Sequence, residues 1–83
     1  MDFTNIDLAE TKYEVTHVEI WYSSTDRLWI IQRLNSMGDQ VGHADYVFNK
    51  PQVIEHCEGN YETVPIHLFK NGSELVKIYN PSN

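Results

Sequence analysis

The sequence predicts an α+β fold in which one short helix covers one face of an antiparallel sheet of about five strands. Three observations support this class: runs of β-branched and aromatic residues separated by turn sequences, one capped helical segment, and an Asn-Gly pair between two apolar runs. The chain has 83 residues, which suits one domain. We therefore expect residues 1–83 to form a single small domain that contains a three-stranded meander, the helix and a C-terminal hairpin.

Residues 1–12 show only weak periodicity. Thr4 or Asn5 would cap a turn that contains Ile6 and Leu8, but a flexible arm is an equal alternative. We therefore expect the regular strands to begin after this arm.

The first hairpin is predicted from residues 13–22, which are rich in β-branched and aromatic side chains. A Ser-Ser-Thr-Asp turn follows at residues 23–26, and the strand pattern resumes at residues 28–31. A turn centred on Thr25-Asp26 sets the register of the hairpin. The expected cross-strand pairs are Tyr22 with Trp29, Ile20 with Ile31, and Val18 with Arg33.

A third strand is predicted over Gln40–Phe48, after a turn at residues 35–39 and with Gly42 as a bulge. His43 and Asp45 lie two residues apart on this strand, so both would point the same way and could share a metal ion. A metal site needs at least a third protein ligand. The possible donors are His17, Glu19 and His67. Because no spacing singles these donors out, a polar strand face is the interpretation that we favour.

A helix of about three turns is predicted over Asn49–Gly59. Asn49 is a good N-cap, Pro51 suits the first turn, and Gln52 can return a capping-box hydrogen bond. Gly59-Asn60 then supplies a left-handed stop. Val53, Ile54 and Cys57 share one face of the helix, which leaves Glu55 and His56 toward solvent. We therefore expect Cys57 to be a small core residue and not a nucleophile.

The C-terminal hairpin is predicted over residues 64–79 from Asn71-Gly72, because this pair tolerates the two left-handed conformations of a type I′ turn. A two-residue loop divides the apolar residues of the hairpin between two faces. One face holds Ile66, Leu68 and Leu75, and the other holds His67, Phe69, Val76 and Ile78.

The first hairpin carries apolar side chains on both faces. The face expected to be core holds Val18, Ile20, Tyr22, Trp29 and Ile31. The opposite face holds Trp21, Leu28, Ile30 and Leu34 beside His17, Glu19 and Gln32. A helix with three inward apolar residues cannot cover both faces. Either the arm covers the second face with Phe3, Ile6 and Leu8, or the register is shifted by one residue, or another chain binds there.

The composition disfavours several classes of function. The chain has 12 Asp or Glu and 6 Lys or Arg residues, for a net charge of -6, and its cations are scattered. Nucleic acids and anionic membranes are therefore disfavoured as partners, whereas a basic protein is favoured. No glycine-rich phosphate loop or catalytic set of residues is present, so we expect neither an enzyme nor a cofactor.

The sequence also predicts a cytoplasmic protein. Cys57 is the only cysteine, so no intramolecular disulfide can form, which suits a reducing compartment. Nothing near residue 1 resembles a signal peptide. No segment approaches the ~20 apolar residues that span a bilayer.

The order of elements from Tyr13 to Tyr79, in a compact acidic chain with tryptophan-rich strands and no catalytic set, resembles the small phage-encoded inhibitors of bacterial defence, among them anti-CRISPR proteins. The resemblance is at the level of the class and rests on no specific motif. It implies stoichiometric binding to a protein, either by imitation of nucleic-acid phosphates or by a sheet surface that locks a subunit.

Three functional hypotheses follow. The first is an inhibitor or adaptor that binds a larger, basic protein through Trp21, Leu28 and Ile30 and the nearby acids Glu19 and Asp26. The second is self-association, with a homodimer formed through the sheet. The third is a small metal-dependent enzyme that uses His43 and Asp45. We favour the first hypothesis and expect self-association to coexist with it.

Overall fold

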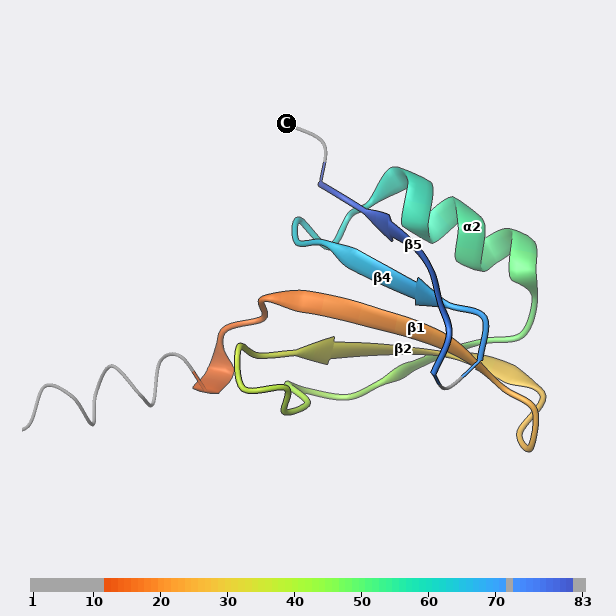
Figure 1. Ribbon diagram of the computed structural model, residues 1–83, viewed down its shortest axis with the longest axis horizontal. Helices are drawn as coiled ribbons and strands as arrows, with labels where there is room; N and C mark the ends of the chain where they lie inside the picture. Colours follow the sequence, from red (N-terminus) through yellow and green to blue (C-terminus); the bar gives the residue numbers. More distant parts are fainter. Residues whose placement is uncertain (1–11, 72, 82–83) are drawn as a thin grey trace, which may run out of the picture.

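The computed structural model describes residues 12–71 and 73–81, which form an α+β fold with a five-stranded sheet (Figure 1). The elements are β1 (His17–Ser23), β2 (Leu28–Leu34), β3 (Asp45–Val47), α2 (Lys50–Gly59), β4 (Ile66–Phe69) and β5 (Leu75–Tyr79). The strands lie in the order β3-β2-β1-β4-β5. The alternatives predicted for the N-terminal arm fall on residues 1–11 and lie outside the described residues.

The sheet is mixed, so the prediction of a purely antiparallel sheet is wrong at one junction. β1 pairs with β4 in parallel, with Val18 opposite Ile66 and Ile20 opposite Leu68, whereas the other neighbours are antiparallel. The cause is the connection through α2, since a helical crossover returns the chain so that the next strand runs in the direction of the last one. β4 therefore follows the direction of β3, which is also the direction of β1.

The first hairpin has the predicted register. All three expected pairs occur, and Trp21 lies opposite Ile30 on the other face. The loop spans residues 24–27, with Arg27 at φ 57° and its N–H bonded to the carbonyl oxygen of Ser23 at 2.8 Å. Turn residues and alternation of apolar side chains were sufficient to predict this hairpin.

The third strand is shorter than predicted. β3 covers only three residues, and Gln40 makes an isolated bridge with Leu34. Gly42 lies between Gln40 and β3. Its φ of 74° is a left-handed conformation that interrupts the strand. The preceding turn is held by the buried Asn35, whose Oδ1 accepts hydrogen bonds from the N–H groups of Met37 and Asp39.

Helix α2 begins and ends as the sequence predicted. Asn49 is the N-cap, and its Oδ1 accepts a hydrogen bond from the N–H of Gln52 at 3.0 Å. Asn60 ends the helix in the left-handed conformation at φ 38°. These caps satisfy backbone groups that a helix of this length would otherwise leave unpaired.

The core lies between α2 and one face of the sheet. Its buried residues are Val18, Ile20, Ile31, Val53, Cys57, Ile66 and Leu68. Cys57 is a core residue, as predicted, and burial raises the pKa of its thiol to about 11. Hydrophobic burial on this face therefore holds α2 against β1, β2 and β4.

The C-terminal hairpin has a longer loop than the predicted two-residue turn. Phe69 pairs with Leu75, and the N–H of Lys70 bonds to the carbonyl oxygen of Glu74 at 2.8 Å. Asn71 is the physical reason, because its Oδ1 accepts hydrogen bonds from the N–H groups of Ser73 and Glu74. The register shift places Leu75 opposite Phe69 and away from the core, which corrects its predicted face, whereas Ile78 lies opposite His67 as predicted.

We expect Ile20→Val to lower the free energy of unfolding by about 1 kcal/mol, because the lost methylene leaves space in a fully buried site. The matched variant Ile78→Val, on an exposed side chain, should change it by less than about 0.5 kcal/mol. Urea unfolding of the two variants measures both values. Equal losses would contradict the assignment of the two faces.

Candidate functional site

A band of large apolar side chains crosses the face of the sheet opposite α2. Trp21 lies opposite Ile30, and Ile30 lies opposite Tyr46, so these three side chains share this face. Glu19 pairs with His67 in β4, and alternation along β4 then places Phe69 on the same face. We call this surface the open face; its apolar members are Trp21, Leu28, Ile30, Tyr46, Phe69, Leu75 and Ile78.

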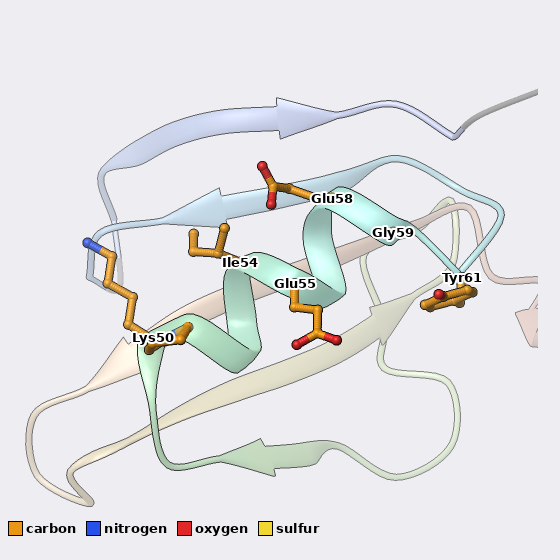
Figure 2. A pocket seen from close by; sticks show the side chains of 7 residues that line it. Lys50, Ile54, Glu55, Glu58, Gly59 and Tyr61 are labelled. Atoms are coloured by element: carbon orange, nitrogen blue, oxygen red, sulfur yellow. The ribbon is translucent and has the colours of Figure 1, made fainter.

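The exposure of these side chains shows that the described residues leave the open face accessible. The predicted binding residues Trp21, Leu28 and Ile30 are half-buried. Tyr46 is 61% exposed, and Leu75 and Ile78 are 48% and 43% exposed. Helix α2 packs on the other face of the sheet, as Figure 2 shows. Apolar side chains therefore face outward across the sheet.

Leu34 lies opposite His17 on the same face as Ile30, as predicted, but it is covered and adds nothing to the accessible apolar surface. It is 4% exposed. The chain that leads into β1 passes beside it, with the N–H of Thr16 bonded to the carbonyl oxygen of Leu34 at 2.8 Å. The surplus apolar surface is thus smaller at this end of the hairpin than the sequence indicated.

Polar side chains adjoin the apolar band. Glu19 lies between Gln32 on β2 and His67 on β4. The His17 ring is 5.3 Å from that of His67, and its Nε2 is 3.8 Å from Oε2 of Glu19. The structure thus groups two imidazoles and one carboxylate beside Trp21. In residues 12–71 and 73–81, no three His, Cys, Asp or Glu side chains are arranged to hold a metal ion.

Asp26 lies at the tip of the first hairpin and not on the open face itself. Its Oδ2 accepts a hydrogen bond from the hydroxyl group of Ser23 at 3.0 Å. Its backbone N–H donates to Oγ of Ser23 at 3.3 Å. Asp26 is exposed and stabilises the turn. Of the predicted binding residues, Glu19, Trp21 and Ile30 come together, with Leu28 at the end of the same face and Asp26 beyond it.

His43 and Asp45 do not form the shared strand face that the sequence suggested. His43 is exposed and lies in the segment before β3. Asp45 begins β3, and its Oδ2 accepts a hydrogen bond from Nη1 of Arg33 at 2.9 Å. Among the residues that the structure describes, no third side chain joins His43 and Asp45 in an arrangement that could hold a metal ion.

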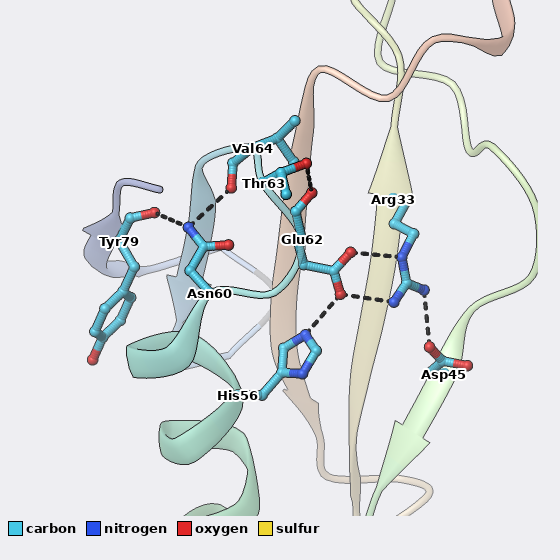
Figure 3. A network of polar contacts seen from close by, with 8 residues as sticks. All are labelled: Arg33, Asp45, His56, Asn60, Glu62, Thr63, Val64 and Tyr79. Atoms are coloured by element: carbon cyan, nitrogen blue, oxygen red, sulfur yellow. Dashed lines mark hydrogen bonds and ion pairs between the residues drawn. The ribbon is translucent and has the colours of Figure 1, made fainter. Parts of the chain in front are cut away.

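A partly buried ion pair fastens the loop after α2 to the sheet (Figure 3). Arg33 donates from Nε and Nη2 to the two carboxylate oxygens of Glu62, at 2.8 and 2.7 Å. His56 Nε2 lies 2.7 Å from Oε2 of Glu62. His56 is therefore half-buried within this network, and the prediction that it faces solvent is wrong.

The electrostatics of this network favour the ionised carboxylate. Burial raises the pKa of Glu62, but the hydrogen bonds and charges of Arg33 and His56 outweigh this effect and leave the pKa below its ordinary value. The hydrogen bond to Glu62 likewise raises the pKa of Arg33, against the opposing effect of burial. The ion pair therefore stays charged across the physiological range.

A shallow groove of about 700 Å³ runs along the outer side of α2 (Figure 2). Its lining residues are Lys50, Pro51, Ile54, Glu55, Glu58, Gly59 and Tyr61. We call it the α2 groove. A smaller hollow of about 250 Å³ shares Glu55 and Tyr61 with it.

Sequence reasoning missed Tyr46 and the α2 groove. Tyr46 was expected in a strand, but no local pattern showed that this strand would lie beside β2 with Tyr46 next to Ile30. Tyr61 follows the helix stop and carries no periodic signal. A tyrosine two residues after the glycine at the end of the predicted helix was the one available hint.

The comparisons add no relative. The chain matches no family model, no curated protein and no solved structure. Within the described ranges, no helix has the length and apolar character needed to cross a membrane. The resemblance to small phage-encoded inhibitors therefore stays a prediction.

We expect Glu62→Gln to lower the free energy of unfolding near neutral pH by about 1.5–3 kcal/mol, because two charge-assisted hydrogen bonds weaken. The low pKa of Glu62 means that its contribution is complete above its ordinary value of 4.5 and is lost as the pH falls through the folded value. Urea unfolding across this range should therefore show a shallower acid decline for the variant than for the wild type.

Glu55→Gln is the matched control, since it makes the same chemical change at an exposed position on α2, the helix that precedes the loop of Glu62. It should change the free energy of unfolding by less than about 0.5 kcal/mol. An acid decline of the same slope in wild type and Glu62→Gln would contradict the role assigned to Glu62.

Proposed function

We propose that this protein is a non-enzymatic binding module that acts as a stoichiometric inhibitor or adaptor on a larger, basic protein, such as a nucleic-acid-binding component of a host defence complex. The observation that carries this proposal is the open face. It joins apolar side chains from all five strands on one side of a small domain.

The apolar band supports protein binding. Exposed apolar patches of several hundred Å² on small domains mark interaction sites. Aromatic residues are enriched among those that dominate binding energy, and Trp21 and Tyr46 lie at the centre and at one side of the band. The rigid sheet also holds these side chains in place before any partner arrives, which reduces the entropy lost on binding.

The charge supports a basic partner. A net charge of -6 attracts a positively charged surface and repels phosphate groups. Glu19 and Asp26 place carboxylates next to the apolar band and at the hairpin tip. We place the protein in the cytoplasm, because its buried free thiol suits a reducing compartment.

Self-association is a second candidate, and one observation favours it. β5 is at the edge of the sheet, and its side chains Leu75, Val76 and Ile78 are exposed. An edge strand with exposed apolar residues can pair with a strand of another chain. The equal charges of two copies oppose this pairing, so we rank it below binding to a basic protein.

We expect the double variant Trp21→Ala, Glu19→Lys to lose at least about 30-fold in affinity for a protein retained by the wild type, since truncation of a central tryptophan removes a binding hot spot. The measurement is quantitative mass spectrometry of proteins that the immobilised chain retains from a bacterial lysate at low and at high salt. Retention by the wild type should fall as salt rises.

Asp39→Lys is the control, because it makes the same change of charge in the exposed turn between β2 and β3. It should keep the retained protein. Equal retention by the wild type and the double variant would remove the open face as the binding surface.

For self-association, we expect sedimentation equilibrium at high protein concentration to show dimers that Val76→Lys shifts toward monomers, since a charge on an exposed edge strand opposes pairing. The matched change Met37→Lys, on an exposed side chain in the turn after β2, should leave the mass unchanged. A monomeric mass at every concentration would exclude this candidate.

A further inference from the structure

Tyr61 is exposed, yet the chain on both sides of it is firmly anchored. Its side chain is 83% exposed, whereas Asn60 is 6% exposed and the Glu62 side chain is 10% exposed. Nδ2 of Asn60 donates hydrogen bonds to the carbonyl oxygens of Val64 and Tyr79, and Glu62 is held by the ion pair with Arg33 (Figure 3). The Tyr61 ring is therefore displayed from a fixed backbone.

The same loop holds two residues in the left-handed region. Asn60 has φ 38° and Thr63 has φ 64°. Asparagine adopts this conformation with little difficulty, but a β-branched threonine rarely does. Strained backbone persists where the surrounding contacts impose it, and it is concentrated at functional sites. The strain next to Tyr61 thus points to a role for this loop beyond connecting α2 to β4.

Gly59 gives a second, independent indication. Its φ is not in the left-handed region, so the backbone does not require glycine there. A Cβ at this position would lie 2.9 Å from Cε2 of Tyr61, which means that glycine leaves room for the ring against the end of α2. Glycine is a poor helix former, and a ring that stays so exposed returns little hydrophobic stabilisation. The arrangement favours the position of the ring over the stability of the helix.

The surroundings of the ring define the chemistry of its ligand. Glu55 and Glu58 both line the α2 groove, and Figure 2 shows their carboxylates on different sides of the helix, with Glu55 on the side of Tyr61 at the C-terminal end. The last carbonyl groups of a helix add partial negative charge at this end. Ile54 and Pro51 make the middle of the groove apolar, and Lys50 disfavours a cation at the far end. The site suits a cation with an apolar neighbour.

We propose that the α2 groove binds an arginine side chain, followed by an apolar residue, from a segment of another protein. The planar guanidinium stacks on the Tyr61 ring and donates hydrogen bonds to the carboxylate of Glu55, while Glu58 adds negative charge further along the groove. The apolar residue lies on Ile54. Arginine suits the site better than lysine, because an ammonium group cannot stack in a plane or form paired hydrogen bonds.

This site goes beyond the open face and can fail separately from it. The open face lies on the side of the sheet away from α2, whereas the groove runs along the outer side of α2. A basic partner that contacted both surfaces would have to pass around the edge of the domain. The two proposals are therefore tested with different probes and different variants.

The probe is the peptide Ac-Ala-Arg-Leu-Ala-NH2, titrated into the full chain labelled with ¹⁵N and followed by NMR. We expect saturable shifts of the amides of α2 and the loop at millimolar peptide. The citrulline peptide, which has the same shape without the charge, should give none. The lysine peptide should bind about threefold to thirtyfold more weakly, because an ammonium group keeps the charge but loses the planar stacking and the paired hydrogen bonds.

Three variants test the residues. Tyr61→Ala should weaken binding by about threefold to thirtyfold, and Tyr61→Phe should preserve it, because the ring face is what the guanidinium contacts. Gly59→Ala separates binding from stability: the added methyl group displaces the exposed ring and weakens binding, while the melting temperature stays equal or rises. A purely structural role for Gly59 would instead lower the melting temperature.

The proposal is overturned if the citrulline peptide shifts the same amides as the arginine peptide. It also fails if Tyr61→Ala binds as the wild type does, because the contact would then be nonspecific attraction to carboxylates. Shifts centred on Trp21 would place the arginine on the open face and likewise contradict the groove. A failure of the open-face proposal, in which the wild type and the Trp21→Ala, Glu19→Lys variant retain the same proteins, would not change the peptide titrations.

Discussion

The rest of the structure depends on one constraint: the ten-residue helix α2 packs on only one face of the five-stranded sheet. α2 buries one face through Val53 and Cys57, and the core forms there. The opposite face is built from the same strands and carries side chains of similar size, because alternation along β1 and β2 places apolar residues on both sides. The two sides of the sheet therefore differ: one is buried and stabilises the fold, and the other leaves apolar side chains accessible and is the surface that we propose for a partner.

The parts of the fold that local signals determine could be predicted from the sequence. The helix follows from Asn49, Pro51 and Asn60, and the first hairpin follows from its turn and its alternation. The parallel pairing of β1 with β4 could not be predicted in this way, since it depends on how α2 crosses the sheet. The hairpin loop was misjudged because Asn71 uses its side chain to bind backbone N–H groups two and three residues further on.

The candidate site shows the same division. Glu19, Trp21 and Ile30 were placed together because their register is local to one hairpin. Tyr46, Phe69 and the ion pair of Arg33 with Glu62 join segments far apart in the chain, and no periodicity reveals such pairs. Glu62 and His56 looked like ordinary surface residues, and only the fold shows that they hold the loop that displays Tyr61.

Cys57 gives the molecule an internal reporter of its own opening. It is the single thiol of the chain, it is 1% exposed, and burial raises its pKa to about 11. Since only an accessible thiolate reacts quickly with alkylating reagents, the folded protein is protected from them. The rate of alkylation therefore measures how often α2 separates from the sheet by local unfolding. No engineered label is needed for this measurement.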